Sequence, residues 1–260
     1  MNGKIRLIAY DIDGTLVPEY GDHVPEENRR AIAWAKGTGC IVCPASGRSH
    51  VNLRRLLGDL VSDTYCISMN GGQIHAPQGE AVHQRTVEDA LAREIMRFLH
   101  DETDGNCIVF CRDSDYLFTS DPDTIAKVSS ITEDPMKILT SPDEIREPII
   151  KVSCYHPDAA AIYPRVAERF GERINVAIAG KEWVDLTVAD KGSGVLDLCA
   201  ILGIRPEEAA AIGDNFNDLP MLEAVGHPVV MNSANPALLE RFPIHCGSVA
   251  EAIERLLADC

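Results

Sequence analysis

The sequence has 260 residues, 45% of them hydrophobic, which is enough for one large domain or two modest ones with a full core. Asp and Glu outnumber Lys and Arg by 40 to 24, and this net charge of −16 argues against a nucleic-acid-binding surface and against anchoring to anionic lipid. No apolar run approaches the roughly 18 residues of a membrane span, and the apolar stretch at the start is too short for a signal peptide. We therefore expect a cytoplasmic protein that binds neither nucleic acid nor membrane.

The nine cysteines fit this expectation. They are odd in number and stand in apolar segments, as small core residues do in a reducing compartment. The pair Cys40-x-x-Cys43 has no partner pair elsewhere, so core packing explains it better than a metal or redox site does.

The first predicted element is a strand over residues 5–9, where a nearly continuous apolar run is typical of a strand buried on both faces of a parallel sheet. Asp11, Asp13 and Gly14 follow it directly. Ligands of open α/β sheets bind just beyond the carboxyl ends of the strands. Two acids one residue apart also repel each other unless a cation or a proton separates them. Taken alone, the same residues could form a solvated turn or a calcium loop.

A helix over residues 26–36 and a second buried strand over 40–45 come next. Ser46 follows this strand at once, ahead of a helix around residues 51–57. The resulting βαβ unit places Ser46 at the same sheet edge as Asp11. A third short strand is predicted over residues 65–69, and it ends in the turn-forming sequence Asn-Gly-Gly.

The pattern changes from about residue 84. We predict helices over residues 88–102, 123–130 and 158–170, and strands over 107–111, 116–119, 149–155, 174–179 and 183–188, the last two joined by a turn at Gly180 and Lys181. Strand pairs with helices on one side describe an α+β unit, so residues 84–185 are predicted to be an inserted domain.

The first pattern resumes with a helix over residues 191–202 and a strand over 209–212, which ends in the acids Asp214 and Asp218. A helix over 219–225, a strand over 228–231 and helices over 236–241 and 249–258 complete the chain. The predicted fold class is therefore α/β, with a doubly wound, mostly parallel sheet built from residues 1–83 and 186–260.

Four predicted sites thus lie at strand ends or at a helix start: the pair Asp11 and Asp13, then Ser46, then Lys191, then the pair Asp214 and Asp218. Each has an ordinary alternative. A serine after a strand is often an N-cap, a lysine in the first turn of a helix is usually solvated, and the last acids could belong to a polar loop. Four such coincidences together are improbable.

These motifs resemble those of the haloacid dehalogenase-like (HAD) phosphohydrolase superfamily. DIDGT at Asp11–Thr15 is similar to its first motif, Ser46 to its second, Lys191 to its third and GDNFND at Gly213–Asp218 to its fourth. The resemblance spans the whole chain in order. The insertion after the second motif resembles a type C2 cap, and the fourth motif resembles the Cof-type, IIB branch.

The resemblance implies a reaction through an aspartyl-phosphate, with Asp11 as nucleophile and Asp13 as general acid and base. Mg²⁺ would be bound by Asp11, the backbone carbonyl of Asp13 and Asp214, with Asp218 one layer further from the ion.

Phosphoryl oxygens would be bound by Ser46, Lys191, Asn217 and the backbone at Gly14. Asp190 departs from the usual small polar residue before the lysine, and its charge is expected to affect the strength of phosphate binding. Arg48 is expected either to contact substrate or to lie on a helix surface.

The resulting prediction is a Mg²⁺-dependent phosphatase acting on a small phosphomonoester such as a sugar phosphate. Two alternatives stay open: a phosphosugar mutase, and a catalytically silent binding or regulatory protein of the same fold. The inserted domain would close over the site and select the leaving group. The sequence does not identify which residues of the inserted domain determine specificity, and it does not indicate the oligomeric state. The candidates for specificity are Arg112, Tyr116, His156, Lys181 and Glu182.

Overall fold

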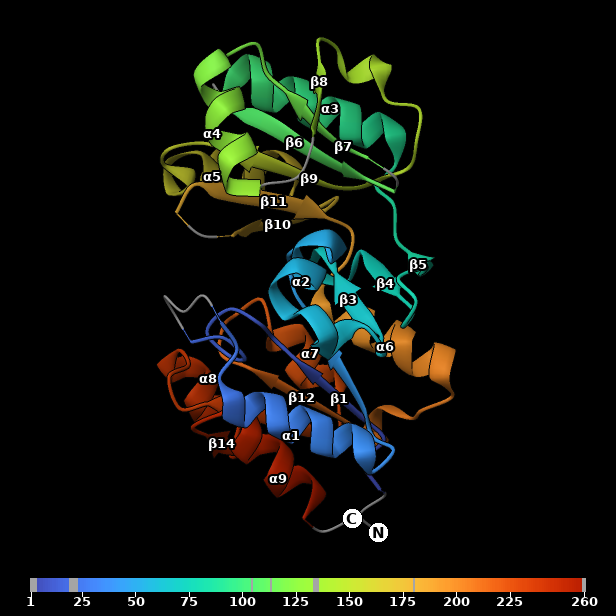
Figure 1. Cartoon of the computed structure of the whole chain (residues 1–260). Coiled ribbons are helices and arrows are strands. Elements are labelled where there is room, and N and C mark those ends of the chain that lie inside the picture. Colours follow the sequence, from blue (N-terminus) through green and yellow to red (C-terminus); the bar gives the residue numbers. More distant parts are fainter. Residues whose placement is uncertain are drawn as a thin grey trace. The chain divides into compact units, whose positions relative to one another are not determined.

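The computed structural model describes residues 4–18, 23–103, 105–112, 114–132, 136–179 and 181–258 (Figure 1). The chain divides into two compact units, a core unit of residues 1–83 and 190–260 and an inserted unit of residues 84–189. The boundary predicted after residue 185 falls inside a strand whose pairing continues to Thr187, so the division comes at residue 189 instead.

The core unit is built on a five-stranded parallel sheet. Its strands are β1 (Leu7–Tyr10), β2 (Ile41–Pro44), β12 (Ala209–Gly213), β13 (His227–Met231) and β14 (His245–Cys246), in the order β14-β13-β12-β1-β2. All four pairings between neighbours are parallel. β1 therefore lies between β12 and β2, and its four residues are all buried.

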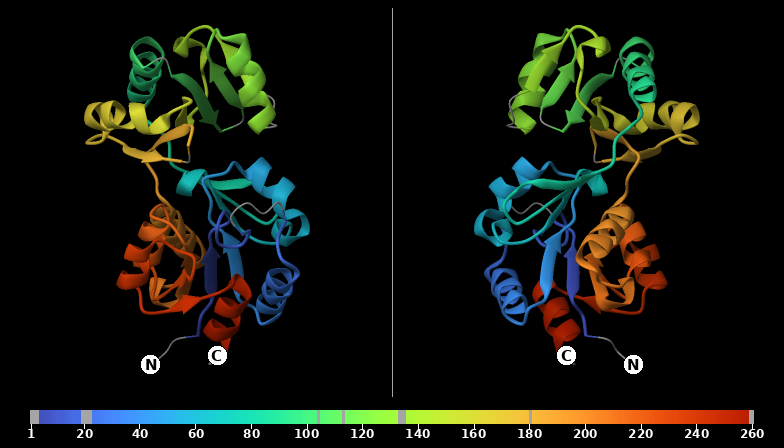
Figure 2. Two further views of the ribbon diagram at one scale, coloured as in Figure 1. Left: turned by 90° about the vertical axis from the view of Figure 1, so that its left-hand side faces the viewer. Right: turned by 90° about the vertical axis from the view of Figure 1, so that its right-hand side faces the viewer.

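Helices cover both faces of this sheet. Ile8 and Tyr10 share one apolar cluster with residues of α1 (Glu26–Gly37), α2 (His50–Leu57) and α9 (Val249–Leu257). Leu7 and Ala9 share another with residues of α6 (Lys191–Leu202), α7 (Leu219–Ala224) and α8 (Pro236–Arg241). Figure 2 shows α1 and α6 on opposite sides of the parallel strands. The predicted α/β class with a doubly wound parallel sheet is confirmed.

A small antiparallel sheet extends the core unit beyond β2. It contains β3 (Cys66–Ser68), β4 (Gln73–His75) and β5 (Ala81–Gln84). Ile67 of β3 forms a parallel bridge to Ala45, so β3 follows the edge of the main sheet. The turn between β3 and β4 consequently lies beside the carboxyl end of β2.

The inserted unit contains a six-stranded sheet in the order β10-β11-β9-β6-β7-β8. Its strands are β6 (Asn106–Cys111), β7 (Asp115–Phe118), β8 (Met136–Leu139), β9 (Ile149–Tyr155), β10 (Asn175–Ile178) and β11 (Trp183–Thr187). Neighbours are antiparallel except β7 and β8. The predicted turn between the last two strands includes Gly180, which lies outside the described residues.

The helices of the inserted unit lie on both faces of its sheet, and not on one side as predicted. Residues of α3 (Asp89–Glu102) and α5 (Ala159–Phe170) share a cluster with Cys107 and Val109. Val128 of α4 (Pro122–Thr132) instead clusters with Ile108 and Leu117, which point to the opposite face because side chains alternate along a strand. Residues 58–61, 142–144 and 206–208 form short 3₁₀ turns.

Across the described ranges, we find no helix that combines the length and the apolar character needed to cross a membrane.

Candidate active site

The predicted motif residues of the core unit meet at one edge of its sheet. Asp11 follows β1, Ser46 lies two residues beyond β2, and Asp214 follows β12. Because these three strands are parallel neighbours, their carboxyl ends lie side by side. Lys191 reaches the same place as the first residue of α6.

Three charged side chains form a buried cluster at this edge. Asp11 is 4% exposed, whereas Lys191 and Asp218 have no exposed surface. The Lys191 ammonium donates hydrogen bonds to Oδ1 of Asp11 and, at 2.5 Å, to Oδ1 of Asp218. The alternative of a solvated lysine is therefore wrong for this residue. A buried ammonium requires such partners, because an unpaired charge in the interior is strongly destabilising.

The cluster carries more negative than positive charge, and its pKa values reflect this. Burial, together with the neighbouring Asp218 carboxylate, raises the pKa of Asp11 to about 8, although Lys191 opposes the shift. Burial by itself would lower the pKa of Lys191, but the Asp11 and Asp218 carboxylates outweigh it and raise that pKa. A bound cation would balance the excess negative charge.

Asp214 adds a third carboxylate beside the pair. Its Oδ1 accepts a hydrogen bond from Oγ1 of Thr15 at 2.7 Å. Gly14 has φ +87°, and a Cβ at this position would lie 2.6 Å from Oδ2 of Asp214, so glycine alone fits here. The N–H of Gly14 donates to the carbonyl of Val17 at 2.9 Å. Gly14 thus makes room for Asp214, and its N–H forms a hydrogen bond within the turn.

Asp218 holds the loop that carries Asp214. Its Oδ2 accepts the backbone N–H groups of Asp214 at 2.9 Å and Asn215 at 3.0 Å, while its Oδ1 accepts from Lys191. One carboxylate oxygen each of Asp11, Asp214 and Asp218 lie within 4.8 Å of one another. Such a set of oxygen ligands fits a hard divalent cation. Since Asp218 already accepts three hydrogen bonds, Asp11 and Asp214 are the better ligands.

Asp13 lies outside the buried cluster and pairs with Arg48. The guanidinium donates from Nε to Oδ2 at 2.9 Å and from Nη2 to Oδ1 at 2.7 Å, a two-pronged contact between partly exposed side chains. The contact with Asp13 raises the pKa of Arg48, whereas partial burial of the guanidinium lowers it. The contact has the larger effect, so the pKa of Arg48 is raised. Of the two alternatives for Arg48, the position on a helix surface is wrong, because the residue precedes α2 and pairs with Asp13. The sequence feature that could have placed Arg48 in the site is its position two residues after Ser46, just beyond the end of a predicted strand.

The remaining predicted residues, Ser46, Asn217 and Asp190, differ in burial and in their contacts. Ser46 is 2% exposed, and its Oγ accepts the N–H of Arg48 at 3.2 Å. The N-cap of α2 is Ser49, so Ser46 is not the cap. Asn217 is exposed in the loop after β12 and is not part of the buried cluster. Asp190 caps α6: its carboxylate accepts the N–H of Ser193 at 2.7 Å.

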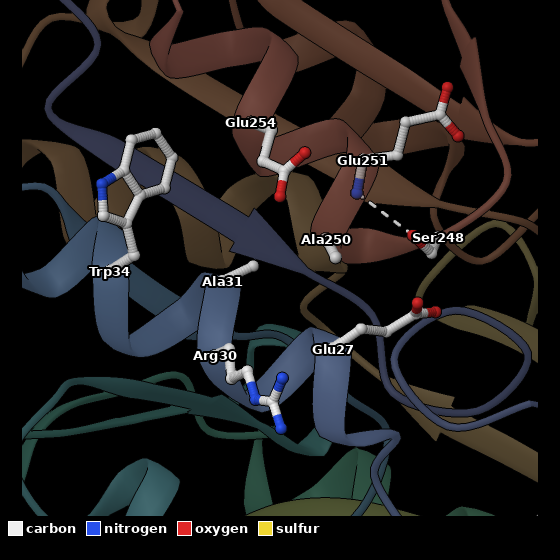
Figure 3. Close-up of a pocket in the computed structure, with 8 residues that line it drawn as sticks. All are labelled: Glu27, Arg30, Ala31, Trp34, Ser248, Ala250, Glu251 and Glu254. Carbon is white, nitrogen blue, oxygen red and sulfur yellow. Dashed lines mark hydrogen bonds between the residues drawn. The ribbon is translucent and has the colours of Figure 1, made fainter.

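A cavity of about 690 Å³ lies elsewhere in the core unit, between α1 and α9 (Figure 3). Ala31 and Trp34 of α1 and Ala250 and Glu254 of α9 are among the residues that line it. None of the predicted site residues lines it. The geometry at the strand ends, and not this cavity, marks the candidate active site.

Comparison with known proteins decides the family. The sequence profile of the haloacid dehalogenase-like hydrolases matches residues 8–253. The chain belongs to this family. This HAD-like hydrolase is 28% identical over 246 residues to the HMP-PP phosphatase of Citrobacter koseri, a match that covers 92% of this chain and 88% of the relative.

Solved structures show the same fold. A haloacid dehalogenase-like hydrolase from B. subtilis superposes with a TM-score of 0.82 at 22% identity, over 96% of this chain and 98% of that one. A HAD subclass IIB sugar phosphatase superposes with a TM-score of 0.79 at 17% identity, over 96% and 98% of the two chains. The family predicted from the four motifs is therefore confirmed.

Proposed function

We propose that this HAD-like hydrolase is a Mg²⁺-dependent phosphatase that acts on a small phosphorylated metabolite. The observation that carries the proposal is the buried cluster of Asp11, Lys191 and Asp218, with Asp214 beside it, at the carboxyl ends of parallel strands. Membership of the family and the phosphatase activities named for its relatives support it.

The proposed reaction begins with Asp11. Its carboxylate attacks phosphorus and the bond from phosphorus to the leaving oxygen breaks, which gives an aspartyl-phosphate. Lys191 is bonded to one oxygen of this carboxylate and so restricts its orientation. Asp13 gives a proton to the leaving oxygen and then takes one from a water molecule. This water attacks phosphorus, the bond from phosphorus to the Asp11 oxygen breaks, and phosphate is released.

Other residues of the core unit would stabilise charge on the phosphoryl group. Ser46 and Asn217 would donate hydrogen bonds, and Lys191 would offset negative charge. Asp11, Asp214 and the backbone carbonyl of Asp13 would hold Mg²⁺, with Asp218 behind them as the anchor of the Asp214 loop. When bound, the ion would offset the negative charge of the carboxylates and of the phosphate.

We propose that the inserted unit selects the leaving group. Two of its candidate specificity residues already have partners within the unit: Tyr116 donates to Glu147 at 2.6 Å, and Glu182 accepts from Lys127 at 2.8 Å.

We also propose the cytoplasm as the place of action, which is supported by eight free cysteines buried among the described residues.

The test is phosphate release from a chromogenic aryl phosphate in the presence of Mg²⁺, followed by a panel of phosphorylated metabolites. We expect release that needs the metal and is abolished in Asp11→Asn, a variant of the same shape without a nucleophilic carboxylate. Full activity of Asp11→Asn would refute the nucleophile assignment. An isomeric sugar phosphate formed without release of phosphate would identify a mutase instead, and failure of the whole panel would favour a silent protein.

A further inference from the structure

A tight turn of unusual conformation joins β3 to β4. Met69, Asn70 and Gly71 have φ values of +53°, +52° and +90°. Within the ranges that the structure describes, Met69 and Asn70 are the only residues other than glycine with positive φ. Residues with a side chain rarely adopt this backbone conformation, and it persists where surrounding contacts stabilise it.

The first set of contacts reaches the loop that carries Ser46 and Arg48. The N–H of Asn70 donates to the carbonyl of Ser46 at 2.9 Å, and the N–H of Met69 donates to the carbonyl of Arg48 at 3.0 Å. The side-chain amide of Asn70 lies so close to Gly47 that a Cβ there would be 3.1 Å away. Both ends of this three-residue loop are therefore bonded to the turn.

The second set of contacts reaches the start of α6. A Cβ on Gly71 would lie 2.1 Å from the carbonyl oxygen of Asp190, and a Cβ on Gly194 would lie 2.8 Å from Cα of Gly71. The same Asp190 carbonyl accepts the N–H of Gly194 at 3.1 Å in the first turn of the helix. The backbone of Gly71 therefore packs directly against the residue that precedes Lys191.

We infer that the Met69–Gly71 turn is a positioning element of the active site, which fixes the Ser46–Arg48 loop relative to Lys191. The inference rests on the proposed function, because it concerns groups assigned there to phosphate and to Asp13. Ser46 and Lys191 are far apart in the chain and come from different elements, so contacts between distant segments set their separation. The turn supplies such contacts through backbone atoms on both sides.

The test compares Gly71→Ala with Gly39→Ala. Gly39 has nearly the same φ, +85°, but nothing lies within 4 Å of a Cβ there, so its variant has the backbone strain without the clash. We expect kcat of Gly71→Ala to fall about 100-fold, because displacements near 1 Å have effects of this size. Inhibition by inorganic phosphate with Mg²⁺ should weaken about 10-fold, the fold-change expected when one phosphate contact worth about 1.4 kcal/mol is lost. Gly39→Ala should keep both wild-type values.

Asn70→Val provides a second variant should Gly71→Ala not fold. A β-branched residue disfavours positive φ without adding a clash at Asp190, and kcat should fall about 10-fold. The inference is overturned if the folded variants keep the kcat and phosphate inhibition of Gly39→Ala. A wild-type protein that neither hydrolyses phosphoesters nor binds phosphate would instead refute the proposed function, and this inference with it.

Discussion

Lys191 is completely buried and shares its positive charge between Asp11 and Asp218. Replacement by Met keeps the volume but leaves two carboxylates buried without a cation. We expect Lys191→Met to lower the free energy of unfolding of the metal-free protein by about 3–5 kcal/mol, the range seen when one partner of a buried ion pair is removed. Urea unfolding measures this difference.

Lys127→Met is the matched control, since Lys127 pairs with Glu182 at the surface. It should change the free energy of unfolding little. Mg²⁺ should restore part of the stability of Lys191→Met, because a ligand that binds only the native state stabilises it. Equal effects of the two substitutions would show that the buried cluster is not an energetic unit.

Arg48 is predicted to act through Asp13. Arg48→Gln removes the two-pronged contact, and kcat should fall about 10-fold while the free energy of unfolding changes little, because the pair is partly exposed. The pH profile of kcat should also change if Asp13 is the general acid. Arg30→Gln removes an exposed contact to Glu26 on α1 and serves as control. An unaltered kcat and pH profile in Arg48→Gln would rule out this role.

At the scale of elements, α2 and β4 meet through two stacked histidines. The rings of His50 and His75 lie 3.8 Å apart with planes 6° from parallel. Burial, followed by the neighbouring His75 and Arg54, lowers the pKa of His50 to about 4. A histidine whose pKa is lower in the folded than in the unfolded state stabilises the fold above the unfolded pKa, near 6.5, and loses that contribution as pH falls towards 4.

We therefore expect the advantage in unfolding free energy of the wild type over His50→Gln to shrink between pH 6.5 and pH 4. Urea unfolding of both proteins at several pH values measures it. Taking the difference removes the acid sensitivity that carboxylates give to both. A difference that stays constant over this range would contradict the lowered pKa of His50.

Some elements carried too little signal in the sequence. β4, β8 and β14 have four residues or fewer, and β5 is largely exposed, so no apolar period distinguishes them. α4 was predicted as a helix, but the face of the sheet that it covers depends on the side to which Ile108 and Leu117 point. Such a choice follows from strand register, which local sequence does not specify.

At the scale of the whole molecule, the chain consists of two units with separate apolar clusters. A fragment of residues 84–189 contains a complete six-stranded sheet and the helices on both of its faces. We expect it to fold alone with a free energy of unfolding of about 5 kcal/mol, as a domain of this size does. Circular dichroism and urea unfolding test this, and a broad, non-cooperative transition would show that the unit needs the rest of the chain.

Several features of this hydrolase were determined by local sequence. An apolar run followed by Asp11 and Asp13 specifies a buried strand with acids at its end, and the same pattern recurs before Ser46 and Asp214. Parallel strands bring their carboxyl ends together, so the meeting of these residues could be predicted. The interruption of the pattern at residue 84 similarly marked the insertion.

Only the tertiary structure decided the contacts across long separations. Arg48 meets Asp13 across 35 positions and Lys191 meets Asp11 across 180, and neither contact leaves a trace in local periodicity. The capping of α6 by Asp190 is another contact that was not predicted from the sequence, where only the charge of this residue next to Lys191 was considered. The sequence Asn-Gly-Gly at residues 70–72 indicated only a turn, and its contacts with Ser46, Arg48 and Asp190 were not predicted. The physical reason is the same in each case: local sequence sets backbone conformation, whereas packing between distant segments sets which side chains share a charge or a hydrogen bond.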